Sequence, residues 1–335
     1  MTATEERLAV RPPRRRITSL EVLCVVLVLA LVLQGQLVDA FDIPALRTGA
    51  TVFVAVCVQA MPFLVLGTLI SGAIAAFLPA EALRRVLPRR SAFAVPVAGL
   101  AGVALPGCEC ASVPVARRLM QQGVAPSVAL AFLLAAPAVN PVVLVATAVA
   151  FPGRPEMVLA RFGGSLLTAV VTGWLWARFG KASWIAARAL ERLPAGGGSR
   201  WAVFAETARH DLVEAGGFLV IGGLTAAALN VLVPSTLLES LSGQWVLGIL
   251  VMALLAVVLA ICSEADAFVA ASLSALPLLP RLVFLVVGPA VDVKLIALQA
   301  GTFGKAFALR FAPLVFAVAV VCGTLAGLVL LGGAA

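Results

Sequence analysis

Two cysteines flank an acidic residue in the middle of an apolar stretch, as Cys108, Glu109 and Cys110. Cysteine thiolates are soft ligands that suit soft metals and thiophilic metalloids, so two of them in one segment could chelate such a species. Cys262 lies in a second interrupted apolar stretch and would add a third sulfur if the two stretches meet. We therefore predict a binding site for a thiophilic solute at these residues. The alternative is that the cysteines pack as small hydrophobes.

Four further ionisable residues, Glu264, Asp266, Asp292 and Lys294, also lie in apolar runs. On membrane-insertion scales such a residue costs about 2.5–3.5 kcal/mol, so it is read as functional by default. We predict that these four residues couple the movement of a solute to a proton or another ion. The alternative for Asp292 and Lys294 is a neutralised structural pair, or a position near the end of a span, in water.

Prolines mark the places where the apolar helices are expected to break. Pro106 and Pro114 bracket the CEC motif, and Pro137 and Pro141 bracket Asn140; Pro289 precedes Asp292. Unwound backbone at membrane depth survives only where protein or a water-filled cavity covers it. Asn140 either presents its amide to a substrate or ties down the break, and we include it among the predicted substrate-binding residues.

The composition shows which solvent surrounds these residues. Of 335 residues, 62% are hydrophobic and 12% are charged, and the mean hydropathy is +1.11. Soluble domains carry about a quarter charged residues, so the bilayer must be the main solvent of this chain. The net charge is +8, and the basic residues lie between apolar runs, where positive charge orients a chain in the membrane rather than binding nucleic acid. We expect a multi-pass protein of the cell membrane with no nucleic-acid partner.

Hydropathy predicts seven full spans, near residues 18–38, 50–78, 126–151, 161–179, 215–233, 281–299 and 311–332. Two further apolar stretches, 92–120 and 243–279, are interrupted by polar residues. If both are re-entrant hairpins, the basic loop 180–214 lies in the cytosol with the N-terminus, as the positive-inside tendency requires. Only Arg47, Arg154, Arg161 and Arg281 then lie outside, together with the C-terminus. An eight-span arrangement with one of the two stretches crossing stays open.

An internal repeat accompanies this pattern. FLVLGTLISGAIAAFLP (63–79) aligns without gaps to FLVIGGLTAAALNVLVP (218–234), and FLLAAPAVNPVVL (132–144) aligns to FLVVGPAVDVKLI (284–296). The predicted topology runs the two copies in opposite directions, and inverted repeats with broken helices that meet at the midplane are common in transporters. The expected fold is an all-α polytopic membrane protein with about 7–8 full spans plus re-entrant segments.

The predicted organisation has five parts. They are a basic cytosolic N-terminus (1–16), an extra first transmembrane helix (17–49), a first transmembrane repeat (50–179), a cytosolic linker with an amphipathic stretch (180–214) and a second transmembrane repeat (215–335).

Four motifs resemble the predicted-permease family of the ArsP and YraQ type: PGCECASVPVARRLMQQGV, AFLLAAPAVNPVVL, CSEADAFVAAS and GPAVDVKLIAL. The resemblance covers roughly residues 50–330 and implies a polytopic permease of the cell membrane. The ArsP branch exports trivalent organoarsenicals, which would place Cys108 and Cys110 on the substrate path. Glu109 and Ala111 stand where the arsenical exporters are expected to have a small polar residue and glycine. In this respect the sequence is more similar to the YraQ branch, whose substrate is poorly established.

These observations predict a permease that exports a small thiophilic solute, such as a trivalent organoarsenical, by ion-coupled secondary transport. The alternative is a permease for another small solute, an inorganic anion or a sulfur compound, with structural cysteines. Neither a nucleotide-binding G-x-x-x-x-G-K-[ST] motif nor H-E-x-x-H occurs, and an Asp266–Asp292 dyad has no motif around it. We expect no enzymatic activity, no cofactor and no metal centre; a homo-oligomer is possible.

Overall fold

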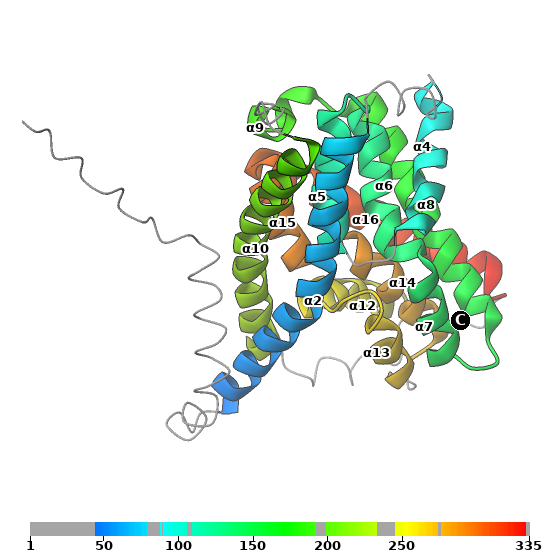
Figure 1. The fold of residues 1–335 in the computed structure, drawn as a ribbon. Helices are drawn as coiled ribbons and strands as arrows, with labels where there is room; N and C mark the ends of the chain where they lie inside the picture. Colours follow the sequence, from blue (N-terminus) through cyan, green and yellow to red (C-terminus); the bar gives the residue numbers. More distant parts are fainter. Residues whose placement is uncertain are drawn as a thin grey trace, which may run out of the picture. The chain divides into compact units, whose positions relative to one another are not determined.

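The computed structural model describes residues 44–78, 88, 90–105, 109–191, 199–232, 245–273 and 276–332, and every regular element in them is helical (Figure 1). The predicted all-α class is confirmed for this part of the chain. The α-helices are α2 (Pro44–Phe77), α4 (Ser91–Ala101), α5 (Glu109–Gln121), α6 (Pro126–Val139), α7 (Pro141–Ala150), α8 (Pro155–Phe179), α9 (Ala187–Leu190), α10 (Arg200–Leu232), α12 (Trp245–Leu259), α13 (Asp266–Ser272), α14 (Leu278–Ala290), α15 (Val293–Phe303) and α16 (Lys305–Leu330). Short 3-10 turns occur at Gly102–Ala104 and Ala182–Trp184.

Six helical segments of the described chain are long and apolar enough to cross a membrane. They are Leu46–Phe77, Pro126–Ala150, Pro155–Phe179, Arg200–Leu229, Leu278–Phe303 and Lys305–Leu330, and they correspond to six of the seven predicted spans. The seventh, 18–38, lies outside the described residues. Helix α10 begins at Arg200, so much of the predicted linker 180–214 continues directly into the span at 215–233.

Two of the six segments are broken near their middles. Asn140 has an extended backbone between α6 and α7; its Oδ1 accepts a hydrogen bond from the Val143 amide at 3.0 Å, and Pro141 follows as the first residue of α7. Asp292 is extended between α14 and α15 and caps α15 in the same way, from the Leu295 amide at 2.5 Å. The repeat alignment sets Asn140 opposite Asp292, and the two side chains have the same local role. The inversion of the repeats stays a prediction.

The first interrupted stretch returns to the end of the helical bundle from which it starts. Trp174, near the end of α8, donates a hydrogen bond to the Ala92 carbonyl in the first turn of α4 at 3.2 Å. Gln121, at the end of α5, donates to the carbonyls of Ala189 and Glu191, which follow soon after α8, at 3.1 and 2.8 Å. We call this end, where α9 lies, the α9 end (Figure 1).

The second interrupted stretch forms a similar hairpin at the other end. A Cβ atom on Gly248, in the first turns of α12, would lie 3.5 Å from Pro280 at the start of α14. The beginning of this stretch and its end therefore lie at the same end of the bundle. Leu279 lies beside Gly327, close to the end of α16, whereas α16 begins beside Ala186 at the α9 end. We call this second end the Phe151 end. The guanidinium carbon of Arg281 in α14 lies 5.9 Å from the centroid of the ring of Phe151, the residue that follows α7. Re-entry of the two stretches into a membrane stays a prediction.

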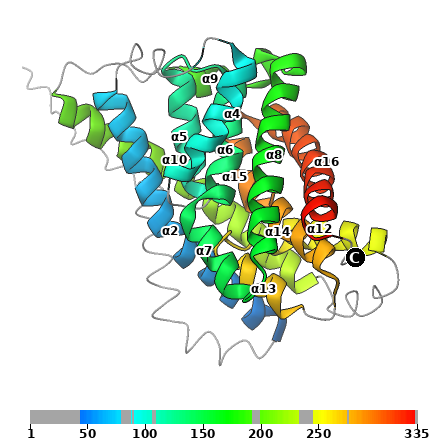
Figure 2. The same ribbon diagram turned by 90° about the vertical axis from the view of Figure 1, so that its right-hand side faces the viewer.

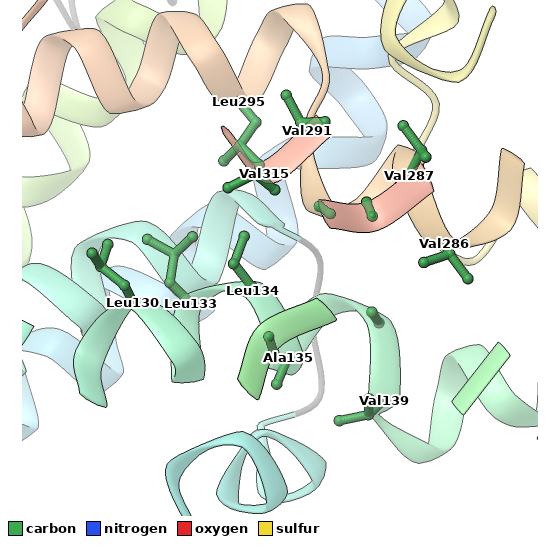
Figure 3. Packing of buried hydrophobic residues seen from close by; sticks show 14 of the residues in the cluster. Leu130, Leu133, Leu134, Ala135, Val139, Val286, Val287, Val291, Leu295 and Val315 are labelled. Carbon is green, nitrogen blue, oxygen red and sulfur yellow. The ribbon is translucent and has the colours of Figure 1, made fainter. Parts of the chain in front are cut away.

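The apolar core lies between the two broken spans. The hydrophobic windows of Pro126–Ala150 and Leu278–Phe303 are 72% and 78% buried, against 33–50% for the other four spans, so these two form the centre. Leu130, Leu133 and Leu134 of α6 lie across from Val287 and Leu295 in Figure 3. Helix α8 packs against both α6 and α16 (Figure 2). Exposed Val58, Leu159 and Val329 lie on the outer spans, where lipid would cover them.

Candidate functional site

Five residues predicted from separate parts of the sequence meet inside the bundle. We call Glu109, Cys110, Cys262, Asp292 and Lys294 the central cluster; each is at most 2% exposed. The Lys294 ammonium is its hub. Its Nζ lies 2.5 Å from Glu109 Oε1, 3.8 Å from Asp292 Oδ2 and 3.9 Å from Cys262 Sγ. The charge of Lys294 also interacts with Cys110.

Broken helices position these groups. Glu109 and Cys110 are the first two residues of α5, and Asp292 and Lys294 lie at the start of α15. Cys262 belongs to the unwound segment between α12 and α13. This segment begins at Ala260, whose φ of +48° lies in the left-handed region that non-glycine residues rarely adopt. Lys294 Nζ donates to the Ala260 carbonyl at 3.3 Å, so the same cation holds the unwound backbone and the neighbouring sulfur.

Two glycines allow the long helices α2 and α10 to approach the cluster closely. A Cβ atom on Gly67 would lie 2.5 Å from the Ala111 Cα atom, and one on Gly222 would lie 2.8 Å from the Lys294 Cα atom. Both distances are shorter than a real side chain tolerates. Gly67 and Gly222 occupy matching places in the first pair of aligned repeat sequences. The sequence analysis missed this role, although their coincidence in the alignment was a usable signal.

A second buried charge pair lies beside the cluster, around Arg161. Its guanidinium donates to both carboxylate oxygens of Asp266 at 2.8 and 2.9 Å, to the Ser263 carbonyl at 2.8 Å and to Thr147 Oγ1 at 2.8 Å. Arg161 is fully buried. Charge counting placed Arg161 on the outer side of the membrane, at the start of the span 161–179, and that side stays a prediction. In the structure α8 begins at Pro155 and carries Arg161 into the bundle.

The acidic groups outnumber the basic ones in this region. Among the residues that the structure describes, the cations that interact with Glu109, Glu264, Asp266 and Asp292 are Lys294 and Arg161. Both carboxylate oxygens of Glu264 are buried and accept no hydrogen bond from another residue in the described part of the chain, and its charge interacts with that of Glu109. A buried carboxylate without a hydrogen-bond partner is costly to keep charged.

Charged residues in the first half of α10 hold the other end of α5. Arg117 forms a salt bridge with Glu214, and Arg118 Nη2 lies 3.3 Å from Asp211 Oδ2. Ser71 of α2 donates to the same Asp211 oxygen at 2.5 Å. The sequence motif of these arginines, PGCECASVPVARRLMQQGV, gave no sign of these partners. A small cavity beside them is lined by Pro114, Arg117, Asp211, Glu214, Ala215 and Thr302.

The remaining predicted residues lie apart from Lys294 or outside the description. Asn140 is buried and spans its break, because its Nδ2 donates to the Ala136 carbonyl at 3.0 Å while its Oδ1 caps α7. Cys108 and Pro106 lie outside the described residues. Pro114 lies inside α5 and does not bound a break; Pro137 and Pro289 lie inside α6 and α14, each a few residues before the helix ends. Among the predicted breaks, Pro141 alone begins a helix in the described chain.

Comparisons with known proteins point to a membrane carrier. Residues 46–328 match the ArsP_1 family, described as predicted permeases. The chain is 34% identical over 262 residues to the UPF0718 protein YcgR of Bacillus subtilis, which covers 77% of this chain and 89% of that protein. It is 31% identical over 267 residues to a putative two-component membrane permease complex subunit of Streptococcus mutans, covering 78% and 88%. No solved structure matches the chain.

Proposed function

The chain belongs to the ArsP_1 predicted permease family, and from this membership we propose that it exports a small thiophilic solute, such as a trivalent organoarsenical, through the central cluster. The carrying observation is the position of Lys294, which lies 3.9 Å from Cys262 Sγ and pairs with Glu109. A nearby ammonium favours the thiolate form of a cysteine, and the thiolate is the form that binds soft electrophiles. Sulfurs from two separate broken segments would bind the solute, with Cys108 as a further ligand.

Coupling to protons accounts for the surplus of carboxylates. A solute that binds thiolates removes negative charge from the neighbourhood of Lys294. Lys294 would then pair more closely with Glu109 and Asp292, and Glu264 would carry the coupled proton. In this mechanism the cysteine thiolates and the carboxylates compete for the Lys294 ammonium, so binding of the solute and of the proton are linked through one cation.

The same geometry disfavours an inorganic anion as the solute. Free helix N-termini attract anions in broken-helix transporters. Here the N-termini of α7 and α15 are capped by Asn140 and Asp292 of the chain itself. The excess of buried carboxylates around Lys294 would also repel a negative solute.

We further propose that the protein lies in the cell membrane with the α9 end in the cytosol, as the basic residues Lys181 and Arg310 at this end favour. The relative from Streptococcus mutans is named as one subunit of a two-component permease complex. A second subunit for this chain is part of the proposal, and co-purification from its native membrane tests it.

The main test is a sensitivity panel in cells that lack their own arsenic exporters. Growth is compared with and without the protein in methylarsenite, inorganic arsenite, antimonite and an unrelated toxic anion. Cys110→Ser, Cys262→Ser and the Cys108→Ser/Cys110→Ser pair should abolish protection. Cys322→Ser is the matched control, because this buried cysteine lies on α16 outside the central cluster. Protection that survives all cluster substitutions, at equal expression, would support the alternative solute with structural cysteines.

A further inference from the structure

The central cluster is closed off from both ends of the bundle, since each of its five side chains is at most 2% exposed. A permease must open its site to one side and then to the other. Two groups of residues hold the returning limbs of the two hairpins in place, and of their members only Asp266 was predicted from the sequence to be functional. They lie on opposite sides of the cluster.

The first group ties α5 to α10 at the α9 end. We call Arg117, Arg118, Asp211 and Glu214 the α9-end latch. Glu109 begins α5 inside the cluster, and the two arginines lie two turns further along the same helix. The Arg117 and Glu214 side chains are 10% and 23% exposed, and the adjoining cavity between α5, α10 and α15 reaches the same residues.

The second group ties α13 to α8 on the side of the Phe151 end. We call Arg161, Asp266 and Thr147, with the Ser263 carbonyl, the Phe151-end latch. Asp266 begins α13 directly after the unwound segment that carries Cys262 and Glu264. The Arg161 and Asp266 side chains are 0% and 2% exposed, so this latch is dry.

We propose that the two latches are the two gates of the solute path. Each holds a limb that is joined to a segment of the cluster: α5 begins with Glu109 and Cys110, and α13 directly follows the unwound segment that carries Cys262. Release of one limb therefore exposes the cluster to one side only. Within the α9-end latch, the Arg117–Glu214 pair separates more readily than Arg161–Asp266, because water already reaches Arg117 and Glu214 and solvates them. The Arg118–Asp211 pair beside it is 5% and 3% exposed, so this pair would be left as buried charges, like the Phe151-end pair. The inference goes beyond the proposed solute and rests only on membership of the permease family.

Side-specific labelling of the cluster cysteines tests the gates. In the full-length chain Cys24, Cys57, Cys108 and Cys322 are replaced by alanine, leaving Cys110 and Cys262. A charged, membrane-impermeant maleimide is applied to right-side-out and inside-out vesicles, and the labelling rate is followed by mass shift. Glu214→Gln should raise the rate at least about fivefold from the α9-end side alone. Asp266→Asn should raise it from the opposite side alone.

The matched control is Glu206→Gln. Glu206 lies on the same helix as Glu214 and also pairs with an arginine, Arg209, but both side chains are more than 60% exposed. It should leave labelling unchanged. The exchange Arg117→Glu/Glu214→Arg keeps the ion pair with its charges reversed and should return labelling to the starting rate, which separates gate opening from misfolding.

Equal labelling from both sides in Glu214→Gln, or a Glu206→Gln effect of the same size, would overturn the gate assignment. So would unchanged labelling in both Glu214→Gln and Asp266→Asn. The assay contains no solute, so it separates this inference from the proposed function. Side-specific labelling without protection in the sensitivity panel leaves the gates standing and rejects the thiophilic solute.

Discussion

The two hairpins, α4–α5 and α12–α13, use opposite charges at related places. In the first, the returning limb α5 supplies the arginines, and α10 supplies the carboxylates Asp211 and Glu214. In the second, the returning limb α13 supplies the carboxylate Asp266, and α8 supplies Arg161. The aligned segments share one glycine position, Gly67 and Gly222, and the capped breaks at Asn140 and Asp292; the latch residues lie outside them. The two capped breaks thus have the same local geometry, whereas the strength of each latch is set by which residues it uses and how buried they are.

The largest effect is expected from breaking the Phe151-end latch. Arg161→Gln leaves Asp266 as an unpaired buried carboxylate and should lower the free energy of unfolding by about 3–5 kcal/mol. Thermal unfolding of the purified protein in detergent measures this loss. Arg161→Gln/Asp266→Asn removes both charges and should be less damaging than the sum of the single changes. A double variant as damaged as that sum would mean that the pair is not coupled.

A smaller effect is expected at the Arg117–Glu214 pair of the α9-end latch. Glu214→Gln removes the charge that faces Arg117 and should cost about 1.5–3 kcal/mol, toward the lower figure because water reaches both groups. The same unfolding assay applies. A loss that equals the Arg161→Gln loss would contradict the difference in burial on which the comparison of the hairpins rests.

The glycines test what the two halves share. Gly67→Ala and Gly222→Ala each place a methyl group within 3 Å of a backbone atom, so each should cost about 1–3 kcal/mol by overpacking. Gly217→Ala is the control on α10, since a Cβ there meets nothing within 4 Å and the helix should gain about 0.5–1 kcal/mol. A large loss at one of the two sites alone would show that the halves do not share this contact.

The smallest effect is expected at the capped break of the first half. Asn140→Ala removes the cap of α7 and the bond to Ala136 and should cost about 0.5–2 kcal/mol. Asn140→Asp, which copies the second half, should keep the cap and lose less. If the aspartate variant unfolds at least as easily as the alanine variant, the equivalence of Asn140 and Asp292 is wrong.

Much of the fold follows from local patterns in the sequence. Hydropathy predicted the six spans that the structure describes, because a helix in lipid must be apolar along most of its length. The break at Asn140 followed from the flanking prolines, and the buried ionisable residues followed from their surroundings. Charge counting gave Arg161 only a side of the membrane, because the rule does not consider a partner such as Asp266.

The sequence by itself determined that this is a membrane protein with broken helices. It also marked Cys110, Cys262, Glu109, Asp292 and Lys294 as candidates for binding a solute or coupling an ion. These properties depend on residue type and near neighbours, which the chain carries along its length. The tertiary structure alone decided that Lys294 lies between Glu109 and Cys262, that Arg161 reaches Asp266 and that Arg117 and Arg118 close the other side. These partners are far apart in the sequence. Which charges meet depends on how close the glycines let the helices approach and on where each unwound segment turns.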